Sequence, residues 1–382
     1  MKVAIPKERR PGEARVAATP DTVKKLKQLG LDVVVEAGAG VTSAVPDAAY
    51  AAAGAAIAPD ARSALADADI VFKVQRPFPD EIALMKKGAA LIASLSALTN
   101  RDEVQTYANA GLTAFAMELV PRITRAQSMD ILSSQANLAG YRAVLEAAHE
   151  YGRAFPMMMT AAGTVAPARV FVMGVGVAGL QAIATARRLG AVVSATDVRP
   201  ATKEQVESLG AKFVMVEDEE TKAAETAGGY AREMSDAYKK KQAALIAETI
   251  TKQDIVITTA LIPGRKAPVL VSEEMVATMK PGAVIVDLAV EQGGNCPLSK
   301  LEQVVTTPNG VKIVGYANLP SRIAVDASAL YARNLLAFLT PLVEKGGDAL
   351  KIDTADEVVA GTLVTRDGAI VHPQLSAQLK GA

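Results

Sequence analysis

Short apolar runs alternate with segments of helical pattern along most of this chain. In the first 120 residues, apolar runs bounded by polar, glycine or proline residues predict strands at 2–5, 33–36, 70–74, 89–95 and 113–117. Helices are predicted between them, at about 20–30, 47–53, 80–87 and 101–110. Strands separated by helices indicate a parallel sheet with helices packed on its faces.

The same alternation continues to the end of the chain. The segment 128–153 predicts one long helix, with an apolar stripe formed by Met129, Leu132, Ala136, Ala139, Ala143 and Ala147. Further strands are predicted at 170–173, 191–196, 212–216, 254–259, 283–287 and 311–314, and helices at 180–189, 242–250, 272–279 and 327–339. Asp367-Gly368 predicts the turn of a hairpin within 361–370.

The stretch 169–197 carries the most specific motif. A strand is followed at once by Gly174-x-Gly176-x-x-Gly179, an Ala-rich helix, a second strand and Asp197. Gly174 allows a tight turn, Gly176 lets the backbone approach a pyrophosphate, and Gly179 lets the helix lie close to the strand. A glycine-rich packing turn would account for the glycines, but not for an acid at the end of the second strand. The motif therefore predicts a dinucleotide site.

Asp197 favours NAD over NADP. A carboxylate at this point accepts hydrogen bonds from a ribose diol and repels a 2′-phosphate. Arg199 weakens this preference, because an arginine can hold a 2′-phosphate.

These patterns predict an α/β fold with two Rossmann-like, doubly wound parallel-sheet domains and a cleft between them. Residues 1–127 form the first domain, which is completed by residues 328–382. Residues 128–327 form the dinucleotide-binding domain, which the long helix enters. Nucleotide sites in such sheets lie at the carboxyl ends of the strands.

Polar residues gather at the start of the long helix. Arg122, Gln127, Asp130 and Ser133 lie just before or within its first turns, and Gln127 and Asp130 are spaced to hydrogen-bond each other. A binding role and an ordinary solvated helix start both fit this cluster. The charged segment 218–233, which contains Gly228-Gly229, fits a mobile loop over the cleft or an ordinary surface connection.

Charge and composition exclude several classes of function. Lys+Arg and Asp+Glu both number 41, so no broad basic surface indicates nucleic acid. The single cysteine, Cys296, allows no internal disulfide, and it has no paired base that would make it a nucleophile. No residues have metal-ligand spacing, and we expect no metal. The apolar stretch 170–186 is shorter than a usual membrane span, so direct membrane insertion is not expected.

Several stretches together resemble one family. PRITRAQSMDILSSQANLAGYRAV, RAFPMMMTAAGTVAPARVFVMGVGVAGLQ and ALIPGRKAPVLV are similar to the NAD(H)-binding component of proton-translocating nicotinamide nucleotide transhydrogenase, whose fold is shared with the alanine dehydrogenases. The resemblance implies a homodimer that holds NAD(H). It also implies two partners, a membrane-spanning proton-conducting subunit and an NADP(H)-binding component. Hydride would pass directly between the coenzymes with Si-/Re- specificity, and only when the partners are present.

The resemblance also implies a location in the cell and roles for single residues. The chain looks like the separate short α-subunit, cytoplasmic and held at the inner membrane through its partners. Arg122, Gln127 and Asp130 would be the catalytic residues, and they would lie with Ser128, Met129 and Ser133 at the nicotinamide end. Val177 would lie at the pyrophosphate beside Gly174, Gly176 and Gly179. Asp197, Val198 and Arg199 would lie at the adenosine ribose, Leu261 near a coenzyme ribose, and Gly229 and Tyr230 in the mobile loop.

Alanine dehydrogenase is the main alternative. Its chemistry needs groups that shuttle protons at the 2-oxo carbon, and the alanine dehydrogenases carry a lysine and a histidine for this purpose. The resemblance puts Gln75 and Ser94 at these two positions, and neither side chain is an acid or base at neutral pH. Arg15, which would bind a substrate carboxylate, is retained. A third possibility is an NAD-binding module without turnover.

Overall fold

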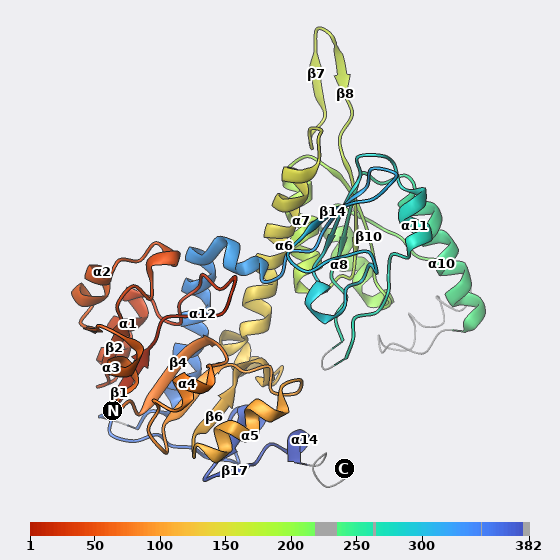
Figure 1. The fold of residues 1–382 in the computed structure, drawn as a ribbon. Helices are drawn as coiled ribbons and strands as arrows, with labels where there is room; N and C mark the ends of the chain where they lie inside the picture. Colours follow the sequence, from red (N-terminus) through yellow and green to blue (C-terminus); the bar gives the residue numbers. More distant parts are fainter. Residues whose placement is uncertain (218–234, 263–264, 345, 377–382) are drawn as a thin grey trace. The chain divides into compact units, whose positions relative to one another are not determined.

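The structure of the protein, a computed structural model, describes residues 1–217, 235–262, 265–344 and 346–376. The chain divides into two compact units, which are described separately (Figure 1). Unit 1 comprises Met1–Gln135 and Ser321–Ala382, and unit 2 comprises Ala136–Pro320. The sequence placed the domain junctions at residues 127/128 and 327/328.

Unit 1 is built on an eight-stranded sheet in the order β17-β16-β6-β5-β4-β1-β2-β3. The six strands that come first along the chain are parallel, and β16 and β17 are antiparallel. The strands are β1 (Lys2–Ile5), β2 (Asp32–Glu36), β3 (Ala56–Ala58), β4 (Ile70–Gln75), β5 (Ala90–Ser94), β6 (Thr113–Ala116), β16 (Leu363–Arg366) and β17 (Ala369–Ile370). The predicted hairpin is confirmed, because Asp367 and Gly368 both have positive φ in the turn between β16 and β17.

Helices cover both faces of this sheet, as the continuous apolar runs of its strands predicted. In β4, Ile70 packs into one core cluster and Val71 into another, as expected for neighbouring residues that point to opposite faces. The helices of unit 1 are α1 (Pro20–Gln28), α2 (Asp47–Ala52), α3 (Ala61–Leu65), α4 (Pro79–Ile82), α5 (Arg101–Asn109), α12 (Ala324–Leu339), α13 (Glu357–Thr362) and α14 (Pro373–Ser376). Short 3-10 turns lie at Val41–Ser43, Met117–Leu119, Thr124–Met129 and Thr340–Leu342, and Leu319–Ile323 joins unit 2 to unit 1.

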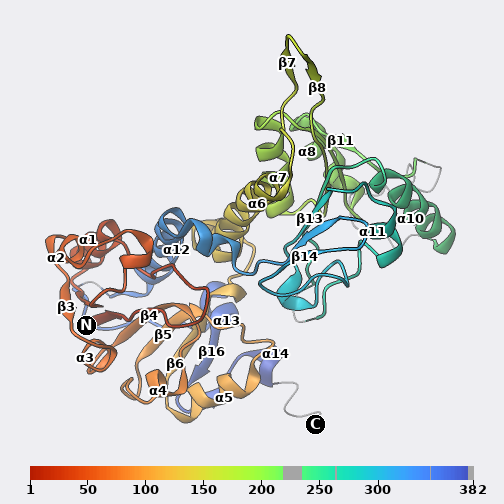
Figure 2. The same cartoon turned by 45° about the horizontal axis from the view of Figure 1, so that its top comes forward.

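Unit 2 contains a seven-stranded sheet in the order β11-β10-β9-β12-β13-β15-β14, in which only β14 is antiparallel (Figure 2). The strands are β9 (Arg169–Met173), β10 (Val192–Thr196), β11 (Lys212–Phe213), β12 (Ile255–Thr258), β13 (Val284–Asp287), β14 (Val304–Thr306) and β15 (Lys312–Val314). The helices are α7 (Val177–Arg188), α8 (Lys203–Ser208), α10 (Asp236–Ile250) and α11 (Glu273–Thr278), with 3-10 turns at Pro200–Thr202 and Val290–Gln292. The strand order reverses between β9 and β12, which is where doubly wound sheets bind nucleotides.

The predicted long helix is shorter than expected at both ends. Helix α6 runs from Ile131 to Glu150, and the residues before it form a 3-10 turn. The helix starts where it does because Asp130 has an extended backbone and its carboxylate accepts a hydrogen bond from the N–H of Ser133. The predicted stripe holds for Ala143 and Ala147, which are buried, but it is wrong for Leu132, which is 51 % exposed.

A two-stranded hairpin in unit 2 was not predicted. Its strands are β7 (Met158–Thr160) and β8 (Gly163–Val165), which pair antiparallel. Figures 1 and 2 both show the hairpin projecting away from the seven-stranded sheet of its own unit. Met159 is 81 % exposed, and Met157 and Met158 are also exposed.

Candidate functional site

The three glycines after β9 have different surroundings in unit 2. Gly174 has a φ of +101°, and a Cβ there would lie 2.6 Å from the Thr259 hydroxyl. A Cβ on Gly179 would lie 1.9 Å from the carbonyl oxygen of Gly174. Gly176 has an ordinary φ of −82°, and a Cβ there would meet nothing within 4 Å. The protein fold therefore requires glycine at 174 and 179, whereas the open space at Gly176 fits a ligand that approaches the backbone.

Helix α7 starts at this glycine turn without a side-chain cap. Gly176 is its N-cap residue and offers no side-chain acceptor, so the N–H groups of the first turn point outward without one. The partial positive charge of the helix adds to these donors. This end of α7 has the chemistry of a phosphate site.

Asp197 is tied directly to the glycine turn. Its carboxylate accepts a hydrogen bond of 2.7 Å from the N–H of Val175, and the backbone and guanidinium of Arg199 donate three more. Burial alone would raise the pKa of Asp197, but these hydrogen bonds outweigh it, so its pKa is lowered. The carboxylate is charged at neutral pH and stands at the carboxyl end of β10. The side chain of Arg199 is half exposed, so a ribose diol can compete with it for the carboxylate.

Exposed apolar side chains surround the turn. Val177 begins α7, Val198 follows β10, and Leu261 and Ile262 follow β12, and all four are exposed, Val198 to 85 %. Apolar side chains left in water beside a turn rich in N–H donors fit a ligand with flat rings and a charged middle. The sequence analysis missed Ile262, although its place directly after a strand at the switch point could have indicated it.

The helix-start cluster lies in unit 1 and divides into two groups. The Asp130 carboxylate accepts hydrogen bonds from the backbone and hydroxyl of Ser133, so these two residues cap α6. The predicted side-chain bond between Gln127 and Asp130 is wrong, because the carboxylate faces Ser133 instead. Arg122, Gln127 and Ser128 are exposed and can meet a ligand, whereas Met129 packs into the core of unit 1.

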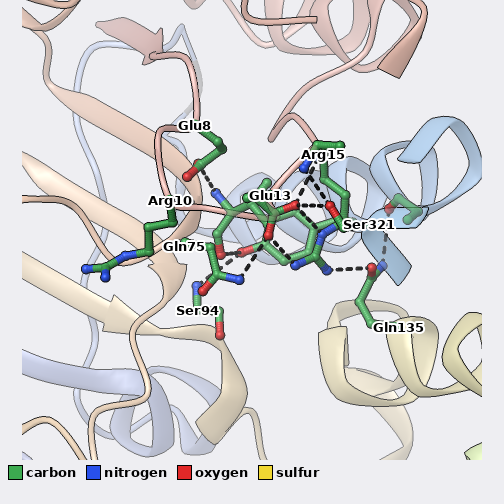
Figure 3. A network of polar contacts seen from close by, with 12 residues as sticks. Glu8, Arg10, Glu13, Arg15, Gln75, Ser94, Gln135 and Ser321 are labelled. Carbon is green, nitrogen blue, oxygen red and sulfur yellow. Dashed lines mark hydrogen bonds and ion pairs between the residues drawn. The ribbon is translucent and has the colours of Figure 1, made fainter. Parts of the chain in front are cut away.

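A buried polar network surrounds Arg15, the residue expected to bind a substrate carboxylate in a dehydrogenase (Figure 3). Arg15 donates to both carboxylate oxygens of Glu13 at 2.8 and 2.7 Å and to Gln135 at 2.8 Å. Gln75 donates to Glu13 at 2.9 Å. Burial alone would raise the pKa of Glu13, but the hydrogen bonds from Arg15 and Gln75 outweigh it and lower the pKa to about 2. The charge of Arg15 is therefore balanced inside the protein.

Other predicted features concern the rest of the chain. Gly229 and Tyr230 lie outside the described residues. Within those residues, no three or more His, Cys, Asp or Glu side chains gather where a metal ion could bind. Every helix in the described parts is too short or too polar to cross a lipid bilayer.

Comparison with known proteins agrees with this geometry. The family model "Alanine dehydrogenase/PNT, N-terminal domain" matches residues 4–139, and the corresponding C-terminal domain matches residues 143–373. The chain is 64 % identical to an NAD(P) transhydrogenase alpha subunit of Rhodospirillum rubrum, over 99 % of this chain and all of that protein. It is 30 % identical to the alanine dehydrogenase of Mycolicibacterium smegmatis, over 99 % of this chain and 97 % of that protein. The crystal structure of transhydrogenase from Sinorhizobium meliloti superposes with a TM-score of 0.89 at 56 % identity, covering 97 % of this chain and all of that one.

Proposed function

Because the chain belongs to the alanine dehydrogenase/PNT family and shares far more sequence with transhydrogenase alpha subunits than with alanine dehydrogenases, we propose that it binds NAD(H) for direct hydride transfer to NADP⁺ on a partner component. When bound, NADH supplies the hydride with its two electrons, and NADP⁺ accepts both. No proton is exchanged at carbon, so the site needs no acid or base. The observation that carries the proposal is Asp197, a charged carboxylate bonded to the glycine turn at the switch point of unit 2.

The residues of unit 2 bind the coenzyme in this proposal. The N–H groups at Gly176 and Val177 hold the pyrophosphate, and Gly174 and Gly179 shape the turn. Asp197 accepts hydrogen bonds from the adenosine ribose. The lowered pKa keeps it ionised, and so it disfavours a 2′-phosphate. Val198 and Arg199 line the same end, and Leu261 packs near a coenzyme ribose.

The exposed residues of unit 1 orient the reacting end. Gln127 steers the nicotinamide and its ribose, and Arg122 supports it. Asp130 and Ser133 act indirectly, because their mutual hydrogen bonds fix the helix start that follows Gln127. Ser128 and Met129 complete this segment, and Gly229 and Tyr230 belong to the loop that closes over the site. Direct transfer needs the reacting carbons about 3–3.5 Å apart, with water kept out.

The network around Arg15 disfavours amino-acid dehydrogenation. Arg15 is the one element of a 2-oxo acid site that is retained, and its guanidinium is already paired with Glu13. Gln75, at the position of the proton-shuttling lysine, cannot change its protonation state. An alanine dehydrogenase would need a proton carrier at this place.

We also propose a homodimer that docks on a membrane-spanning, proton-conducting subunit and an NADP(H)-binding component. The protein would then lie at the cytoplasmic face of the inner membrane through these partners. The exposed methionines of the β7–β8 hairpin support a second copy as neighbour, since such a surface is stabilised by burial. Light scattering of a Met158→Ser, Met159→Ser double variant tests this point, and an unchanged mass would remove the hairpin from the interface.

The test of the function is reconstitution. Membranes that contain the proton-conducting and NADP(H)-binding components are mixed with the chain, and NADH-dependent reduction of an NADP⁺ analogue is followed. We expect activity only in the complete mixture. Oxidation of alanine by the chain alone, or a complete mixture without transfer, would contradict the proposal.

A further inference from the structure

A buried carboxylate organises the loop beyond β13. Asp287 is fully buried at the end of the strand and accepts hydrogen bonds from the N–H groups of Ala289, Asn295 and Cys296 and from the hydroxyls of Thr258 and Ser299. The chain turns around the carboxylate through two glycines of positive φ, and a Cβ on Gly294 would lie 2.8 Å from an Asp287 oxygen. This arrangement fixes the position of Asn295.

The side chain of Asn295, also fully buried, holds the loop that follows β12. Its Oδ1 accepts from the N–H of Ala260 at 3.1 Å, and its Nδ2 donates to the carbonyl of Ala260 at 2.9 Å and to that of Pro268 at 2.8 Å. Both N–H bonds of the amide are thus used. One side chain therefore joins the two described flanks of the loop, at Ala260 and at Pro268.

The same loop is joined to the glycine turn on its other side. The hydroxyl of Thr259 donates to the carbonyl of Gly174 at 2.9 Å. Leu261 and Ile262 follow directly, with exposed side chains at the carboxyl edge of the sheet. Their place relative to the phosphate-binding turn is set by Thr259 on one side and Asn295 on the other.

We infer that Asn295 is a positioning residue for coenzyme binding, which acts by aiming Leu261 and Ile262 at the bound dinucleotide. The inference rests on the proposed function, because it requires that NAD(H) binds beside the glycine turn. Asn295 does not touch the reacting carbon. Its loss raises the KM for NADH and leaves kcat nearly unchanged, as expected when binding is lost equally in the ground and transition states.

The experiment compares Asn295→Ala with Asn309→Ala. Asn309 is the matched control, because its Nδ2 also holds a loop of unit 2 by donating to Val276 at 2.9 Å, but at the amino edge of the sheet. NADH affinity is measured by fluorescence titration of the full chain, thermal unfolding is recorded, and KM and kcat are measured in the reconstituted complex. We expect both variants to unfold at lower temperature, and only Asn295→Ala to lose about tenfold or more in NADH affinity, with kcat within about threefold of wild type.

Two results would overturn the inference: wild-type NADH affinity in Asn295→Ala, or an equal loss in Asn309→Ala. If Asn295→Ala does not fold, Asn295→Asp replaces it. This variant keeps the acceptor for Ala260 and loses both donors, and the same loss of affinity is expected. Failure of the wild-type chain to bind NADH would instead refute the proposed function, so the two failures are distinguishable.

Discussion

Replacing Gly176 by alanine separates binding of a coenzyme from stability of the fold. The new methyl group meets no protein atom within 4 Å, and the φ of −82° suits alanine. A compatible Gly→Ala change stabilises a protein by about 0.4–1 kcal/mol through the unfolded chain. Alanine is a poorer N-cap than glycine by a similar amount. We therefore expect the free energy of unfolding to change by less than about 1 kcal/mol.

The effect on NADH binding should be much larger. The methyl group occupies the space through which a pyrophosphate reaches the N–H groups at the start of α7. A hydrogen bond to a charged group contributes about 1.5–3 kcal/mol, so loss of one such bond weakens binding about 10- to 150-fold. Gly179→Ala is the contrasting variant, because its Cβ would lie 1.9 Å from the Gly174 carbonyl oxygen. Overpacking of this kind costs about 1–3 kcal/mol, so this variant should lose stability as well as affinity.

The assay is fluorescence titration with NADH beside urea unfolding of the same samples. Gly176→Ala should lie on the wild-type unfolding curve and far from the wild-type binding curve. Wild-type NADH affinity in this variant would refute the assignment of the turn to the pyrophosphate. A large loss of stability would show that the space at Gly176 is filled by the protein itself.

Four further predictions test the remaining parts of the site. Asp197→Ala should lower NADH affinity about 10- to 150-fold and narrow the preference for NADH over NADPH, both measured by titration, and an unchanged preference would contradict its role at the ribose. Gln127→Asn should slow hydride transfer in the reconstituted complex more than it weakens NADH binding; stopped-flow rates equal to wild type would refute steering. The chain alone should neither oxidise alanine nor reduce pyruvate in a spectrophotometric assay, and turnover of either would restore the dehydrogenase alternative. Because the pKa of Glu13 is about 2 in the folded protein against 4.5 ordinarily, Glu13→Gln should cost on the order of 3 kcal/mol at neutral pH, and urea unfolding should show this gap narrowing from pH 4.5 towards pH 2, whereas a constant gap would contradict it.

Features set by local sequence were predictable. The glycine turn, the strands on both sides of it and the hairpin around Asp367-Gly368 each depend on neighbouring residues, and the structure confirms them. The start of α6 was also local, since an aspartate three residues before a serine fits an N-cap, but the apolar stripe suggested an earlier start. Short elements such as β3 and β14 were missed because three residues carry too little periodicity.

Contacts between distant residues were not predictable. Asn295 holds Ala260 across 35 positions, and an amide that bonds to backbone atoms leaves no pattern of side-chain types in the sequence. The exposed hairpin at 158–165 was missed for a different reason. Its strands lack the alternation of apolar and polar residues that one buried face imposes, because neither face is packed within its own unit.

The last strands of unit 1 impose an order on biosynthesis. Strand β16 pairs with β6, so residues near position 115 wait for residues near position 363 before the sheet edge is covered. All of unit 2 leaves the ribosome during this interval and can fold first. Until translation is almost finished, β6 presents a bare and largely apolar edge, which is where a nascent chain is most prone to aggregate and most in need of a chaperone.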